Sequence, residues 1–170
     1  MRIPVFVSCP TTLSPAQERA RLNLIEFVEN FNLEPRALGR SDYPAELPLR
    51  EVLVIARHCA GGLILGFEQF RATSGTWKRG TKAEKKIDAK NAVCMPSAWN
   101  HLEAGILFGL GLPILIFREE EITGGVFDNG VTDVFVHKMP LAKNKAIDAE
   151  SLKEVFLKWH SRVLARYFML

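Results

Sequence analysis

"PSAWNHLEAGILFGLGLPILIF", residues 96–117, contains a helix start, a helix, a helix end and a buried strand in that order. Ser97 is a preferred N-cap residue, and the apolar spacing after it predicts a helix to about residue 110. Gly111 is placed to end this helix, and the unbroken apolar run 113–117 is typical of a strand buried on both faces. A helix that leads directly into a buried strand is a repeating unit of α/β sheets.

The chain on both sides of this stretch continues the alternation. Four more apolar runs predict strands, at residues 4–8, 34–38, 63–67 and 133–137. Three more helices are predicted: one starts with Ser14 as N-cap, Pro15 and Gln17, one spans about 49–60 and stops at Gly61-Gly62, and one spans about 149–168 after Asp148 as its cap. This order predicts a mainly parallel five-stranded sheet covered by helices.

Length and composition predict one domain, residues 1–170, that is soluble and cytoplasmic. The 170 residues are 48% hydrophobic, enough for one sizeable core. No apolar run approaches the roughly 20 residues that span a bilayer, and the N-terminal apolar segment is too short for a signal peptide, so no membrane partner is expected. Cys9, Cys59 and Cys94 are an odd number without C-x-x-C spacing, which predicts reduced thiols and no metal site.

The net charge of +3 is unevenly distributed along the chain. Residues 71–90 hold seven basic side chains but only two acidic ones, Glu84 and Asp88. A nucleic-acid-binding protein usually spreads basic charge over a folded face, whereas the segment 71–95 has the composition of a surface loop or a short solvated helix. We therefore expect a basic insertion at 71–95 that is either solvated or contacts phosphate or a partner, and we do not expect nucleic acid as that partner.

The functional site is predicted near the helix start at Ser97. In a parallel α/β sheet the ligand crevice lies beyond the carboxyl ends of the strands, where this helix would begin. Trp99 and Glu103 are spaced i and i+4 and share a face, with Asn100 adjoining. A carboxylate beside an indole is partly desolvated, which should raise its pKa. The alternative is that Glu103 caps a loop or pairs with an arginine such as Arg40, while Trp99 packs in the core.

Two loops supply further candidates for substrate binding. Ser8, Cys9 and Pro10 follow the first predicted strand, where they either present backbone N–H groups to a phosphate or form an ordinary turn. Arg40 and Asp42 follow the second predicted strand and are candidates for contacts with a phosphate and a ribose hydroxyl. Neither a G-x-G-x-x-G nor a G-x-x-x-x-G-K-[ST] motif is present, so phosphate cradles of those kinds are not supported.

Gly66 and Phe67 end the third predicted strand and are also candidates. A glycine there allows close approach of a ligand and an aromatic ring can stack on a base, with simple packing as the alternative. The loop "TGGVFDNG", residues 123–130, is either a lid over the crevice or an ordinary loop. His101 points roughly 160° away from Glu103 around a 3.6-residue helix, so we expect it at the surface rather than in the site.

The residues Ser97, Trp99 and Glu103 resemble the S-x-W-x-x-x-E signature of TIR domains, whose glutamate is catalytic in the members that cleave NAD. The continuation Glu103-Ala104-Gly105 with residues 109–114 is similar to a motif of nucleoside 2-deoxyribosyltransferases, whose glutamate is the nucleophile. Both resemblances imply a flavodoxin-like three-layer sandwich and cover roughly residues 4–137. The loop at 39–48 falls where TIR domains carry the BB loop.

The resemblance to TIR domains implies cleavage of the nicotinamide–ribose bond of NAD, with Glu103 as the catalytic residue. NAD is then a substrate and no cofactor is expected. The implied product is ADP-ribose or a cyclised or conjugated derivative. The resemblance to the signal-generating TIR proteins of antiphage defence implies that this product acts on a separate effector protein. The alternatives are a nucleoside or nucleotide deoxyribosyltransferase or N-glycosidase, and a non-catalytic nucleotide-binding or scaffold module.

Self-association is a further expectation. TIR-like enzymes that cleave NAD commonly act as assemblies, so the resemblance implies a homo-oligomer, with the loop 39–48 as the suspected donor to a neighbour's site. The last predicted helix carries Phe156, Trp159, Val163 and Phe168 along one side. This apolar side either packs in the core or serves self-association.

Overall fold

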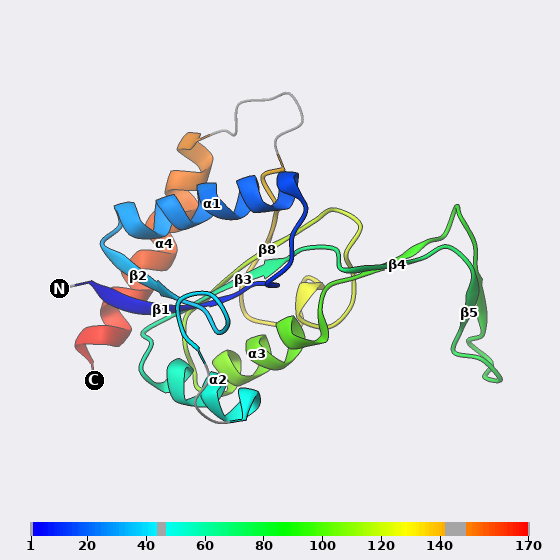
Figure 1. The fold of residues 1–170 in the computed structure, drawn as a ribbon, viewed down its shortest axis with the longest axis horizontal. Helices are drawn as coiled ribbons and strands as arrows, with labels where there is room; N and C mark the ends of the chain where they lie inside the picture. Colours follow the sequence, from blue (N-terminus) through cyan, green and yellow to red (C-terminus); the bar gives the residue numbers. More distant parts are fainter. Residues whose placement is uncertain (1, 44–46, 142–148, 170) are drawn as a thin grey trace.

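The computed structural model describes residues 2–43, 47–141 and 149–169 of the chain. Asp148, the predicted cap of the last helix, and part of the loop 39–48 lie outside the described residues. Figure 1 shows a central sheet between two layers of helices, with the two chain ends at the same side of the molecule.

The central sheet has five strands, and every neighbouring pair in it is parallel. Their order across the sheet is β2-β1-β3-β8-β9, which is the order of flavodoxin-like folds and confirms the predicted fold class. The bounds are β1 Ile3–Ser8, β2 Leu33–Arg36, β3 Gly62–Gly66, β8 Ile114–Arg118 and β9 Val136–Lys138. The fifth strand thus begins three residues later than predicted, after exposed Phe135.

Helices cover both faces of this sheet (Figure 1). On one face lie α1 (Pro15–Asn30) and α4 (Ala149–Phe168), and on the other lie α2 (Pro48–Arg57) and α3 (Ala98–Gly109). Side chains of β3 alternate between the two layers, with Leu65 packed on the α1 side and Ile64 on the α3 side. Strands buried on both faces explain why the sequence shows them as unbroken apolar runs.

Local signals in the sequence account for the helix ends that position the site. The Ser14 hydroxyl accepts a hydrogen bond from the backbone N–H of Gln17, and the Gln17 side chain accepts one from the backbone N–H of Ser14, so the predicted capping box is confirmed. Ser97 caps α3 by accepting from the backbone N–H of Asn100. Gly111, with φ +66°, follows the end of α3 as predicted.

The prediction that Gly61 and Gly62 stop the second helix is wrong. This helix ends at Arg57, and Gly62 already belongs to β3. A Cβ atom on Gly61 would lie 2.6 Å from Cγ2 of Val163, and one on Gly62 would lie 2.7 Å from Cδ1 of Leu107. Both positions therefore lack a side chain because helices pack against the strand there.

The apolar side of α4 packs in the core. Phe156, Trp159 and Val163 are buried, and Nε1 of Trp159 donates a hydrogen bond of 2.9 Å to the carbonyl oxygen of Pro113. Phe168 does not share this burial, since 78% of it is exposed. The three buried side chains are thus used in the core of the domain.

The segment 71–95 is neither the loop nor the short helix that the sequence suggested. It forms two antiparallel strand pairs: β4 (Phe70–Ala72) with β7 (Val93–Met95), and β5 (Gly75–Trp77) with β6 (Lys85–Ile87). Figure 1 shows this element, residues 70–95, projecting from the body of the molecule, and we call it the basic arm.

Two smaller expectations concern the cysteines and membranes. Cys9, Cys59 and Cys94 are free thiols, as predicted. Within the described ranges, no helix combines the length and the apolarity that crossing a bilayer requires.

The core should fold without the basic arm, because no residue of β5 or β6 belongs to either buried cluster. Ala72 and Val93 are directly paired, so replacing residues 73–92 by Asn-Gly would join β4 and β7 through a two-residue hairpin turn. We expect the melting temperature of this arm-excised variant, measured by circular dichroism, to stay within a few degrees of that of the wild type. Loss of the cooperative transition would contradict this prediction.

Candidate functional site

A cavity of about 380 Å³ lies at the carboxyl ends of β1 and β3. The strand order reverses between these two strands, which is where parallel α/β sheets hold their ligands. The lining residues come from the loops after the first three sheet strands and from the starts of α2 and α3: Cys9, Pro10, Thr11, Thr12, Leu38, Gly39, Pro48, Gln69, Ser97, Trp99 and Glu103.

Glu103 lies in the wall of this cavity with only 8% of its surface exposed. Burial raises the pKa of its carboxyl group to about 7, while a hydrogen bond with Ser8 acts in the opposite direction. Among the described residues no ion pair within 4.0 Å involves Glu103, and Arg40 pairs with Glu18 instead. The site therefore holds a carboxyl group whose pKa is raised toward neutral pH.

A buried hydrogen-bond network fixes the partner of this carboxyl group. Nδ2 of Asn100 donates to Oγ of Ser8 at 2.8 Å and to the carbonyl oxygen of Leu65 at 3.3 Å. Its Oδ1 accepts a bond of 3.1 Å from the hydroxyl of Ser97. Because the amide nitrogen can only donate, Oγ of Ser8 accepts there, which leaves the Ser8 proton for Glu103. Asn100 thus holds the Ser8 oxygen as an acceptor, and the Ser8 hydroxyl proton remains available to lower the pKa of Glu103.

Trp99 and Cys9 give the cavity its other walls. Trp99 has 42% of its surface exposed and lines the cavity together with Glu103, one helical turn away. An indole in this position offers a flat apolar face to a planar ligand. Burial raises the pKa of the Cys9 thiol to about 12, so this thiol is neutral and does not compete with Glu103 as a nucleophile.

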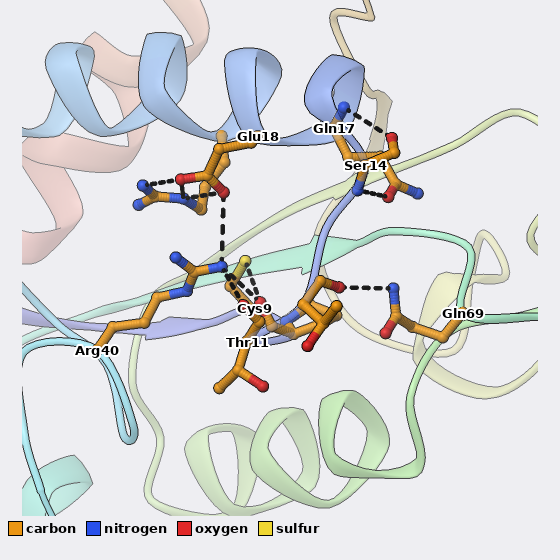
Figure 2. Close-up of polar contacts among 10 residues, drawn as sticks. Cys9, Thr11, Ser14, Gln17, Glu18, Arg40 and Gln69 are labelled. Carbon is orange, nitrogen blue, oxygen red and sulfur yellow. Dashed lines mark hydrogen bonds and ion pairs between the residues drawn. The ribbon is translucent and has the colours of Figure 1, made fainter.

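The loop after β1 is held from both sides (Figure 2). Arg40 donates to the carbonyl oxygens of Pro10 and Thr11, at 2.8 and 3.1 Å, and its guanidinium lies 3.5 Å from the Glu18 carboxylate. On the other side, Nε2 of Gln69 donates to the carbonyl oxygen of Thr12 at 3.4 Å. Arg40 thus shapes the cavity from behind the loop rather than lining it.

Three other predicted binding residues lie away from the cavity. Asp42 forms a bidentate ion pair with Arg36 and accepts a hydrogen bond of 2.8 Å from Ser41. Gly66 faces Phe127, whose ring carbon would lie 2.4 Å from an added Cβ. Phe67 is fully buried in the layer beneath α1 and α4. Both oxygens of Asp42 are engaged by Arg36, so Asp42 has a structural role. Gly66 and Phe67 contribute to packing.

Several lining residues were not singled out from the sequence. Thr11 and Thr12 extend the loop after β1, Gly39 adopts φ +76° in the loop after β2, and Gln69 follows β3 by three residues. Their common signal is position, since each lies just beyond the carboxyl end of a sheet strand. Nothing in their residue types distinguishes them from other loop residues.

The loop 123–130 does not line this cavity. Its residues Gly125–Phe127 form a short 3-10 helix, and Phe127 is buried against the His101 ring at a centroid distance of 5.4 Å. His101 is half-buried here rather than at the open surface, and this burial lowers its pKa. The loop therefore packs on the side of α3 opposite to Glu103.

The raised pKa of Glu103 predicts a pH-dependent stability. Between its ordinary pKa of 4.5 and about 7, the unfolded chain ionises while the folded one does not, so wild-type stability falls as pH rises. In urea unfolding, the free energy of unfolding of Glu103→Gln, relative to that of the wild type, should increase by up to about 3 kcal/mol between pH 4.5 and pH 8. Glu18→Gln should show the opposite trend and at lower pH, because Arg21 lowers the pKa of Glu18: its difference from the wild type should develop below about pH 4.5 and stay constant above it. If the curves of stability against pH ran parallel for Glu103→Gln and the wild type, this result would contradict a buried carboxyl group.

Neither a protein-family model nor a curated protein sequence matches this chain. The geometry of the cavity is therefore the basis for a functional conclusion. That geometry is one buried carboxyl group of raised pKa, oriented by a serine and flanked by an indole, at the switch point of a parallel sheet.

Proposed function

We propose that this protein is a TIR-like NAD glycohydrolase or cyclase that cleaves the nicotinamide–ribose bond. One observation carries the proposal: Glu103 is the only carboxylate among the described residues that line the cavity. The chemistry of N-glycosidic cleavage, together with this solitary acid, favours NAD over an ordinary nucleoside.

Cleavage of an N-glycosidic bond builds positive charge on the sugar, which a nearby carboxylate stabilises or captures. In NAD the leaving group is a cationic pyridinium that takes the bonding electrons and departs as neutral nicotinamide, so it needs no proton. A purine or pyrimidine leaves as an anion unless an acid protonates it. A cavity with one carboxylate therefore suits NAD, because Glu103 is free to act on the sugar.

In this proposal Ser8 acts on the Glu103 carboxyl group and Trp99 binds the substrate. Ser8 donates a hydrogen bond that keeps the carboxyl group oriented and favours its ionised form. Trp99 offers a stacking face for the nicotinamide ring. A cavity of about 380 Å³ lies within the range of small-ligand sites, and we place the nicotinamide riboside half of NAD inside it. The rest of the dinucleotide would then extend beyond the mouth of the cavity.

Two alternatives share the same cavity. A nucleoside 2-deoxyribosyltransferase would use Glu103 as nucleophile but would need an acid for the leaving base. A non-catalytic module would bind a nucleotide without turnover. The proposal also includes a homo-oligomer in which the loop 39–48 reaches a neighbour's site, and a product that acts on a separate effector in antiphage defence.

Incubation of the purified protein with NAD should release nicotinamide, and Glu103→Gln should reduce that release by at least about 100-fold, since the carboxylate acts directly on the sugar. Chromatography of the products separates nicotinamide from ADP-ribose and its cyclic forms. Glu26→Gln, an exposed change on α1, is the matched control and should keep wild-type activity.

The same assay with deoxynucleosides and nucleotides distinguishes the alternatives. Release of free base that depends on Glu103 would favour the transferase or N-glycosidase. Binding of NAD by calorimetry without any turnover would contradict the enzymatic proposal and favour a binding module.

The pH profile should identify the form of Glu103 that reacts. If the carboxylate acts on the sugar, kcat/KM for NAD rises with pH through about 7 and levels off above it. Ser8→Ala removes the hydrogen bond that lowers this pKa, so the midpoint should move to higher pH. An activity that falls with rising pH over this range would show that Glu103 acts as an acid instead.

A further inference from the structure

The basic arm carries an excess of positive charge that its own acids do not neutralise. Glu84 accepts a hydrogen bond of 2.6 Å from the backbone N–H of Gly80. Asp88 accepts bonds of 2.9 Å from the backbone N–H groups of Lys90 and Asn91. Both carboxylates therefore stabilise turns of the arm.

Six cations of the arm are exposed, and in the described part of the chain none has an ion pair within 4.0 Å: Lys78, Arg79, Lys82, Lys85, Lys86 and Lys90. Arg71, at the base, differs because it pairs with Glu68 and Glu121. Like charges on a narrow ribbon repel one another, so this arrangement favours a polyanionic partner. The arm extends away from the sheet (Figure 1), where such a partner can reach it.

An indole lies among these cations. Trp77 and Lys85 are directly paired across β5 and β6, which places both side chains on the same face of the ribbon. Trp77 has 42% of its surface exposed. This face borders a cavity of about 790 Å³ between the arm and the start of α3, to which Lys86, Met95 and His101 also contribute. The cavity is separate from the one that Glu103 lines.

We propose that the basic arm binds single-stranded nucleic acid, with a base stacked on Trp77 and an adjoining phosphate held by Lys85 on the same face of the ribbon. Lys86 belongs to the opposite face by strand alternation but also borders the cavity, and it would hold a further phosphate of the strand. Alternation of an aromatic platform with cations in a groove is the arrangement that binds single strands without sequence preference. Nucleic acid was not expected from the sequence because the segment resembled a solvated loop. In the structure this segment is folded into antiparallel strand pairs rather than a loop, so the reason for excluding nucleic acid no longer applies.

The indole favours a single strand over other polyanions. The bases of a duplex are already stacked on one another and leave no free face for Trp77, so a duplex would engage only the lysines. An acidic protein segment would also pair with the lysines but has no base for the indole. The proposal is independent of the proposed enzymatic activity, because it involves neither Glu103 nor its cavity.

Fluorescence anisotropy with labelled 20-nucleotide single strands of DNA and RNA, at several salt concentrations, tests this proposal. Trp77→Ala should weaken binding by at least about fivefold, the lower end of the stacking contribution of one base. Phe135→Ala removes an exposed aromatic side chain that lies outside the arm and outside both cavities, and it should leave binding unchanged.

The lysines have a separate readout. Lys85→Gln with Lys86→Gln should lower the slope of log affinity against log salt by about 1.4, which corresponds to two lost phosphate contacts. The same changes at exposed Lys153 and Lys158 of α4 are the matched control and should leave the slope unchanged. The arm-excised variant should not bind, although its melting temperature shows that it is folded.

Three outcomes would overturn the proposal. One is the absence of single-strand binding at low salt. Another is equal binding of wild type and Trp77→Ala, together with tighter binding of a duplex of the same length. The third is binding of polyglutamate to the arm without binding of either single strand, which would identify an acidic protein as the partner.

Discussion

The hydrogen bond from Asn100 to Ser8 is the interaction on which the arrangement of this molecule depends. It joins the first turn of α3 to the end of β1, and a second bond from Asn100 extends the connection to β3. These are the two strands between which the chain reverses its order across the sheet. Because the bond is buried, neither partner can turn to water without a cost, so the helix start stays aligned with the strand ends. The position of Glu103 in the cavity wall depends on that alignment.

Features that depend on neighbours in the sequence could be predicted from it. The helix that begins after Ser97, its end near Gly111 and the alternation of strands with helices all follow from capping and apolar spacing. The i, i+4 spacing of Trp99 and Glu103 indicated that an indole and a carboxylate would share one side of that helix. Such signals involve residues that lie within one or two helical turns of one another in the sequence. They can therefore be recognised without knowledge of the fold.

Features that depend on distant partners could not be predicted. The strands of the basic arm have three residues each, too few to show a period, and β4 pairs with β7 across more than twenty residues. Asp42 seemed free to bind a ribose, but Arg36 lies across the loop from it and takes both of its oxygens. The lining of the cavity likewise comes from separate loops whose meeting is a property of the sheet order rather than of any one segment.

The position of α3 has a thermodynamic consequence. Its first turns form a wall of two cavities, with Trp99 and Glu103 facing one and Ala98 and His101 facing the other. A rigid helix cannot shift for one occupant without shifting for the other. If a ligand in either cavity displaces this helix, the affinities of the two sites are linked, and each ligand changes the binding of the other by the same factor. The first turns of one helix thus take part in the walls of two chemically unrelated sites.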